Sequence, residues 1–350
     1  MNRLRLASPL RRLALSLVLS CFVLLLLLQA VDLTAFFNVL QSANLALLLI
    51  ATLKVPANYL ILWLRWHLIL TGGGFKVSRG SLWAAVMVGC FFNNVTPGLK
   101  VGGDPLKAYY LTRKYDLDFK TVMAGIAAER TLQGVTLVIT AAVALLMSVI
   151  VRLPFSSIQA FAWLTMVTTA LVAISLYVAV YKVETLIRAA GRLLRLLRLS
   201  PRANRTTTLD RLKRGVGVFH REYAVLLRNM RVVVAVIGLT VLQLALAFTQ
   251  AYLIFRALHA DIPFIYVILG TTAVKVSGIV AITPGGAGIA EGVNFGVYTI
   301  LQSVPGEVIA AQTLLSRALD TWLIWISSGI VTAFVAPDLM HGMGKGPDHK

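Results

Sequence analysis

Charged residues are scarce in this chain. Of its 350 residues only 13% are Asp, Glu, Lys or Arg, while 58% are hydrophobic. So little polar surface cannot solvate a globule of this size, which argues against a water-soluble protein. We therefore predict a single membrane domain, residues 1–340, without a soluble domain of any size, followed by a short flexible tail at 341–350.

Cysteine and histidine are also rare. The two cysteines, Cys21 and Cys90, lie in apolar segments and indicate no disulfide framework. The five histidines do not cluster at metal-ligand spacing, and no Walker motif offers an ATP site. No serine-histidine-acid set and no transferase domain are evident. We expect no metal, no cofactor and no catalytic residues, and we favour a role other than that of an enzyme.

Long apolar stretches predict the fold class. They do not alternate as strands would, and each can cross a hydrocarbon core of ~30 Å as a helix. The sequence therefore predicts an all-α, polytopic membrane protein. Its six expected spans lie at about 13–31, 45–66, 121–150, 160–181, 232–257 and 308–335.

The basic residues predict the orientation. The segment 182–231 carries 13 Lys or Arg against three Asp or Glu, and cytoplasmic loops collect Lys and Arg. We expect this loop and both termini in the cytoplasm. Part of the loop, about 186–197, has the pattern of a basic amphipathic helix suited to an anionic leaflet. It lacks the aromatic residues that stack on bases, so we expect no nucleic-acid partner.

One local pattern occurs twice. From the proline to the acid is 7 positions in both copies, and from the acid to the arginine is 26. Such weak internal repeats are typical of transporters, although chance recurrence is an alternative. The members are Thr96-Pro97-Gly98, Asp104 and Arg130 in the first copy, and Thr283-Pro284-Gly285, Glu291 and Arg317 in the second.

Each copy is expected to turn a re-entrant hairpin. Proline lacks an N–H donor and glycine permits tight non-helical turns. The hinge residues would be Pro97, Gly98, Gly103, Pro284, Gly285 and Gly286. We predict two inverted repeats, about 45–150 and 232–335, with the first hairpin entering from the cytoplasm and the second from outside. A purely structural bend, and eight to ten full spans, are the alternatives.

Several charges fall within the apolar segments: Lys54, Lys275, Arg130 and Arg317. A buried charge costs at least ~2.5–3.5 kcal/mol on insertion scales, so such residues usually face a cavity or pair with one another. Arg65 ends the expected span 45–66, where snorkelling to the interface is easy.

The ordered motifs resemble the lysylphosphatidylglycerol synthase transmembrane (flippase-like) family over about residues 10–335. The matching residues are Asn93-Asn94-Val95-Thr96-Pro97, Gly103-Asp104 with Lys107, Glu129-Arg130, and Pro284-Gly285-Gly286-Ala287-Gly288 with Glu291 and Arg317. The resemblance implies a prokaryotic inner-membrane protein. In members fused to an aminoacyl- or glycosyltransferase domain, this region is taken to move the modified lipid between leaflets.

The predicted function is therefore translocation of an anionic phospholipid or lipid-linked headgroup across a bacterial inner membrane. The expected substrate-binding residues are Asn94, Asp104, Lys107, Glu129, Arg130, Glu291 and Arg317. The family prefers arginine where Lys107 stands. A lysine ammonium cannot donate two parallel hydrogen bonds to a phosphate as a guanidinium can. The alternative is a membrane enzyme, or an accessory subunit of a separate lipid-modifying transferase, acting on lipid-linked substrates.

Overall fold

A computed structural model describes most of the chain. The described residues are 18, 32–95, 103–115, 117–153, 205–280, 283–301 and 304–344, together with scattered positions between 159 and 177. All regular elements in this part of the chain are helical, so the expected all-α class is confirmed. The expected span 13–31 apart from Val18, most of 160–181, and the amphipathic stretch 186–197 lie outside the described residues.

Four helical stretches are long and apolar enough to cross a membrane, and they confirm four of the expected spans. They are Leu45–Gly72, Phe119–Ile150, Met230–Ala257 and Gly306–Val335. The first consists of α3 (Leu45–Thr52) and α4 (Lys54–Gly72), and the second and third are α7 and α11. The fourth is broken into α14 (Gly306–Arg317), the π-helical η2 (Ala318–Trp322) and α15 (Leu323–Gly344).

Polar residues placed just before the apolar runs start these helices. Asn44, Asp118 and Asn229 each accept a hydrogen bond from a backbone N–H in the first turn of α3, α7 and α11. Asp32 does the same for the short helix α2 (Leu33–Gln41). Such caps satisfy N–H groups that have no partner within the helix, so they set where each helix begins.

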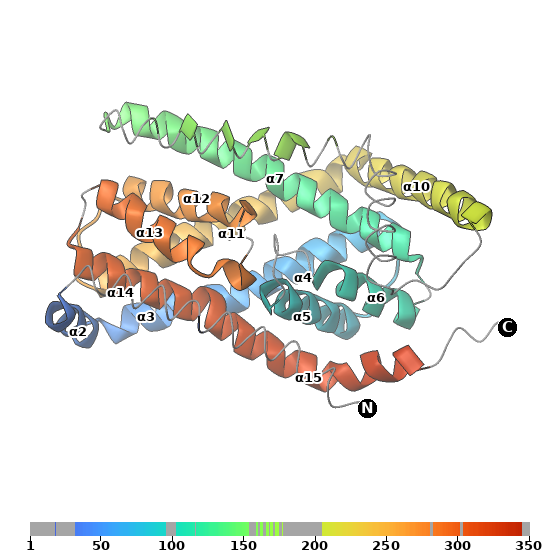
Figure 1. The fold of residues 1–350 in the computed structure, drawn as a ribbon, viewed down its shortest axis with the longest axis horizontal. Coiled ribbons are helices and arrows are strands. Elements are labelled where there is room, and N and C mark those ends of the chain that lie inside the picture. Colours follow the sequence, from blue (N-terminus) through green and yellow to red (C-terminus); the bar gives the residue numbers. More distant parts are fainter. Residues whose placement is uncertain are drawn as a thin grey trace.

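Two antiparallel helix pairs lie between the long helices. The first is α5 (Arg79–Val95) with α6 (Gly103–Tyr115), and the second is α12 (Phe264–Val280) with α13 (Ile289–Ile300). They point toward each other from opposite ends of the long axis, with α5–α6 to the right and α12–α13 to the left (Figure 1). The C-terminal end of α5 meets the turn η1 (Pro284–Gly286), which follows α12, near the middle. A Cβ on Gly285 would lie 3.4 Å from the carbonyl oxygen of Asn94 at the end of α5.

The expected turn at Pro284 is present. It forms the 3-10 helix η1 (Pro284–Gly286), in which Gly285 and Gly286 have φ of 61° and 74°. The corresponding turn with Pro97 and Gly98 lies outside the described residues. The re-entrant placement of both pairs in a membrane stays a prediction.

Part of the expected cytoplasmic loop is helical. Helix α10 (Arg205–Arg228) packs beside α7 (Figure 1). Its last two turns bring Tyr223 and Leu226 into an apolar cluster with Ala128 and Leu132 of α7 and Val236 of α11. This end of α10 is therefore fixed to the spanning helices.

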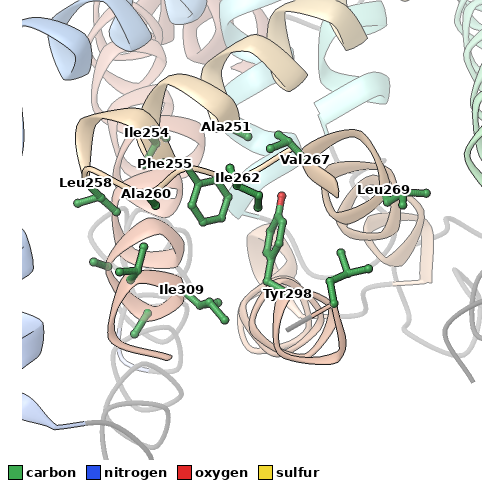
Figure 2. Close-up of a cluster of buried hydrophobic side chains, with 14 of the residues drawn as sticks. Ala251, Ile254, Phe255, Leu258, Ala260, Ile262, Val267, Leu269, Tyr298 and Ile309 are labelled. Atoms are coloured by element: carbon green, nitrogen blue, oxygen red, sulfur yellow. The ribbon is translucent and has the colours of Figure 1, made fainter. Parts of the chain in front are cut away.

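The largest apolar core holds α12–α13 against α11 and α14. At its centre the ring of Tyr298 meets that of Phe255 edge to face, with centroids 4.9 Å apart (Figure 2). Gly270 on α12 lets this ring approach, because a Cβ there would lie 2.5 Å from Tyr298 Cζ. The packing of the Tyr298 ring on the α12 backbone at Gly270 thus positions the second helix pair.

We expect Gly270→Ala to destabilise the protein by about 1–3 kcal/mol, the usual range for inserting a methyl group into a packed core. Gly278→Ala on the same helix is the matched control, since its Cβ would meet nothing within 4 Å. Thermal unfolding of the purified protein in detergent measures the difference. Equal melting temperatures for the two variants would contradict this packing.

Candidate functional site

The predicted Asp104 and Arg130 form an ion pair in which the carboxylate is buried. Arg130 on α7 donates from Nε and Nη2 to Asp104 Oδ2, at 3.0 and 2.9 Å. Asn93 completes the arrangement, because its amide donates to Asp104 Oδ1 at 3.2 Å and its side-chain oxygen accepts from the Gly103 N–H at 2.7 Å. The carboxylate is therefore held by the ends of α5 and α6 and by α7.

Gly103, one of the expected hinge residues, lies where two helices pack closely. It is the first residue of α6, and a Cβ there would lie 2.1 Å from the carbonyl oxygen of Gly89 on α5. A side chain cannot fit between the two backbones. Gly103 thus permits α6 to start against α5, which places Asp104 in the interior.

Glu129 gathers a second set of partners. Trp66 donates from Nε1 to Glu129 Oε2 at 2.7 Å, and Gln133 donates to Oε1 at 3.2 Å. Arg65 Nε lies 3.4 Å from Oε1, and Lys107 Nζ lies 3.7 Å from Oε2. Adjacent positions on α7 thus send Glu129 toward α4 and Arg130 toward α6.

Lys107 links the two carboxylates. Its Nζ lies 3.8 Å from Asp104 Oδ1 and 3.7 Å from the centroid of the Trp66 ring. We call Arg65, Asp104, Lys107, Glu129 and Arg130 the first charge cluster. Its three cations and two carboxylates leave a net charge of +1, and all but Arg130 are nearly inaccessible.

The interpretation of Arg65 as a snorkelling residue is wrong. Helix α4 continues to Gly72, so Arg65 lies two turns inside the span and is fully buried. It donates to Thr240 on α11 at 3.1 Å as well as pairing with Glu129. A fully buried guanidinium requires such partners, because water cannot reach it.

The second copy of the pattern also forms an ion pair. Arg317 Nε on α14 lies 2.8 Å from Glu291 Oε1 on α13, and both side chains are buried. Glu291 Oε2 accepts from the Gly288 N–H at 2.8 Å, which caps α13 at the turn. Asn294 stands three positions after Glu291, as Lys107 does after Asp104, and donates to Gln312 and Thr313 on α14.

The structure groups the predicted residues unevenly. Asp104, Lys107, Glu129 and Arg130 come together, while Glu291 and Arg317 form a separate pair. Asn94 donates its amide to the carbonyl oxygen of Cys90. Arg65, Trp66 and Asn93 were missed as site residues, although Asn93 stands within the motif that carries the family resemblance.

These features define a polytopic helical membrane protein whose spans carry buried, paired charges. The chain belongs to the family of the lysylphosphatidylglycerol synthase TM region, whose model matches residues 13–328. The expected resemblance is thereby confirmed.

The chain is also similar to several archaeal proteins, each described as a UPF0104 membrane protein. One from Methanothermobacter thermautotrophicus is 25% identical over 263 residues, which cover 75% of this chain and 77% of the relative. One from Pyrococcus horikoshii is 23% identical over 321 residues, covering 90% and 94%. Another, from Methanocaldococcus jannaschii, is 23% identical over 320 residues, with the same coverage.

We expect Glu129→Gln to destabilise the fold by about 3–5 kcal/mol, because it leaves Arg65 and Lys107 buried without this carboxylate. Glu307→Gln, in the first turn of α14, is the control and should cost about 0.3–1 kcal/mol through the helix dipole. Unfolding in detergent compares the two. If Glu129→Gln unfolds no more easily than Glu307→Gln, Glu129 does not hold the cluster together.

Proposed function

We propose that this protein moves an anionic phospholipid, or a lipid-linked headgroup, between the leaflets of the membrane. One observation carries the proposal. The acid and the arginine that recur with the same spacing form an ion pair with each other in both copies, as Asp104–Arg130 and Glu291–Arg317. Buried charges in membrane spans mark substrate or ion pathways, and a doubled pair suits a carrier built from two similar units.

The arrangement of the helix pairs supports an inverted plan. The start of α5, the end of α6 and the start of α7 lie at one end of the bundle, on the right in Figure 1. In the sequence, these segments carry Lys76, Arg79, Arg113, Lys114 and Lys120 with Asp118. The start of α12 and the end of α13 lie at the other end, with the start of α2, the ends of α7 and α11 and the start of α14. In the sequence, these segments carry Asp32, Arg152, Arg256, Asp261 and Glu307. The excess of basic residues favours the cytoplasm for the first end, so the two pairs would enter from opposite sides.

Arginine held by a carboxylate suits reversible binding of a phosphate group. The guanidinium keeps its charge and presents parallel donors, and the acid balances that charge when no substrate is bound. The side chain of Arg130 is 40% exposed, whereas that of Arg317 is 10% exposed. This difference suits a carrier in which one pair is accessible while the other is closed.

Substitution of the two arginines tests the proposal. We expect Arg130→Ala and Arg317→Ala each to lower lipid movement in proteoliposomes by at least about tenfold, the equivalent of one lost charged hydrogen bond. Lysine at either position should restore it only partly, because a point charge lacks the fork geometry. Quenching of a fluorescent headgroup from one side of the vesicle measures the movement.

Arg256→Ala is the matched control, since Arg256 also pairs with an aspartate, Asp261, but at an exposed site. It should move lipid at the wild-type rate. A double variant Arg130→Ala, Arg317→Ala that inserts normally and keeps wild-type lipid movement would show that neither ion pair binds the headgroup.

The inverted topology predicts the labelling of single cysteines in a background without Cys21 and Cys90. Lys114→Cys, in the last turn of α6, should react with an impermeant maleimide only from the cytoplasmic side. Asp261→Cys, before the α12–α13 pair, should react only from outside. Both positions are exposed, so accessibility does not limit the reaction. Labelling of the two positions from one and the same side would contradict the inverted plan.

A further inference from the structure

The ammonium group of Lys107 is buried beside two carboxylates but donates to neither of them. Its Nζ lies 3.8 Å from Asp104 Oδ1 and 3.7 Å from Glu129 Oε2, both beyond hydrogen-bond distance, and no other described residue accepts a hydrogen bond from it. The side chain is only 8% exposed. An ammonium group carries three N–H donors, and buried donors normally have partners. This lack of an acceptor indicates one that the protein itself does not supply.

Both carboxylates of the first charge cluster have closer partners than Lys107. Asp104 accepts two hydrogen bonds from Arg130, at 3.0 and 2.9 Å. Glu129 accepts one from Trp66 Nε1 at 2.7 Å. Lys107 is therefore the third cation beside two acids, and the cluster has a net charge of +1. One added negative charge would balance it, whereas two would leave an unfavourable net charge inside an apolar bundle.

The ring of Trp66 holds the ammonium group where an acceptor would otherwise be needed. Lys107 Nζ lies 3.7 Å from the centroid of this ring, which is a cation–π contact. The aromatic face attracts the charge but is a weaker acceptor than a carboxylate oxygen, so the N–H donors stay available. The stem of Lys107 passes over α5, since a Cβ on Gly89 would lie 3.4 Å from Lys107 Cδ. Helices α4 and α5 thus hold both ends of the side chain.

Arg130 joins this buried cation to the accessible side of the cluster. Its side chain is 40% exposed, and its Nη2 lies 2.9 Å from Asp104 Oδ2. Lys107 approaches the other oxygen of the same carboxylate. An anion that reaches Arg130 is therefore separated from Lys107 by a single carboxylate group.

We propose that Lys107 balances the charge of the bound headgroup, so that the first charge cluster takes a phosphodiester with one negative charge, and that Trp66 is the positioning residue of Lys107. Arg130 would meet the phosphate at the accessible side, and Lys107 would neutralise its charge from within. This inference rests on the proposed function and names its substrate class. Lipids with a phosphodiester headgroup of one net negative charge fit the cluster, and phosphomonoesters with a second charge do not.

Two lipids test the charge balance in the wild-type protein, without any substitution. Short-chain phosphatidylglycerol carries one negative charge, and at about pH 8 short-chain phosphatidic acid carries about two, since the second pKa of a phosphomonoester is about 6. Titration calorimetry in detergent measures both affinities. We expect phosphatidylglycerol to bind about tenfold or more tightly. Equal affinities, or tighter binding of phosphatidic acid, would overturn the assignment of a singly charged ligand.

Substitution of Lys107 tests its part in the site. Lys107→Gln should bind phosphatidylglycerol about tenfold or more weakly, whereas Lys107→Arg keeps the charge and should bind within about threefold of the wild type. Lys76→Gln, at an exposed lysine in the α4–α5 connection, is the control and should bind as the wild type. A folded Lys107→Gln variant with wild-type affinity would overturn the site.

A matched pair of variants isolates the ring of Trp66. Trp66→Phe and Trp66→Leu both lose the N–H that donates to Glu129, but only phenylalanine keeps an aromatic face under Lys107. We expect the leucine variant to bind phosphatidylglycerol about threefold or more weakly than the phenylalanine variant. In a Lys107→Gln background the two should bind alike, which loss of packing alone would not produce. Equal affinities with Lys107 present would overturn the positioning role.

Dimethyl phosphate, a soluble phosphodiester, distinguishes the two sources of the anion. If it displaces phosphatidylglycerol at similar concentration, the site takes a free phosphodiester; if it does not, the lipid headgroup is the ligand. Binding of either that depends on Lys107 supports the site, and binding of neither overturns it. A wild-type protein that binds phosphatidylglycerol through Lys107 but moves no lipid would remove the proposed function alone. Wild-type lipid movement by Lys107→Gln would overturn the site alone.

Discussion

The structure depends on the pairing of charges inside apolar helices. A lone ion there is unfavourable by several kcal/mol, whereas a well-placed opposite charge and hydrogen bonds make it tolerable. Each pair joins different elements: Glu129 ties α7 to α4, Asp104 ties α6 to α7, Glu291 ties α13 to α14, and Lys54 ties α4 to η2. Helices distant in sequence are therefore held in one arrangement by side chains that lipid cannot replace.

The same constraint places polar groups at the centre of the bundle. The chain turns after α12 at Pro284–Gly286, and backbone groups at this turn are satisfied by Glu291 and Thr283. The two copies share the acid–arginine pair but differ around it. Lys107 adds a charge in the first, where Asn294 makes a neutral amide network in the second. One unit therefore carries a larger group of directly paired charges than the other.

Much of this plan could be predicted from the sequence. Apolar length alone located four spans, because burial of the backbone in lipid requires helices of that length. The repeated spacing singled out both members of each ion pair as site residues. The acid and the arginine lie on consecutive helices, but the spacing alone did not show that they form an ion pair with each other.

Other features depend on tertiary contacts that no local pattern records. Arg65 was placed at a helix end because the hydropathy falls there, yet α4 continues to Gly72 and takes the side chain inside. In the sequence Trp66 is one more apolar residue of the span, and only the folded chain brings Glu129 to its N–H. Lys54 and Asp320 are separated by 266 positions, so only the folded chain brings them together.

The central claim is that the paired charges serve the movement of an anionic headgroup. Its most direct test uses the wild-type protein in vesicles that contain trace fluorescent phosphatidylglycerol, or the zwitterionic phosphatidylcholine, and follows quenching from one side. The account predicts that the protein speeds movement of phosphatidylglycerol well above the rate in protein-free vesicles, and more than it speeds movement of phosphatidylcholine. Equal rates with and without protein, or equal acceleration of both lipids, would contradict it.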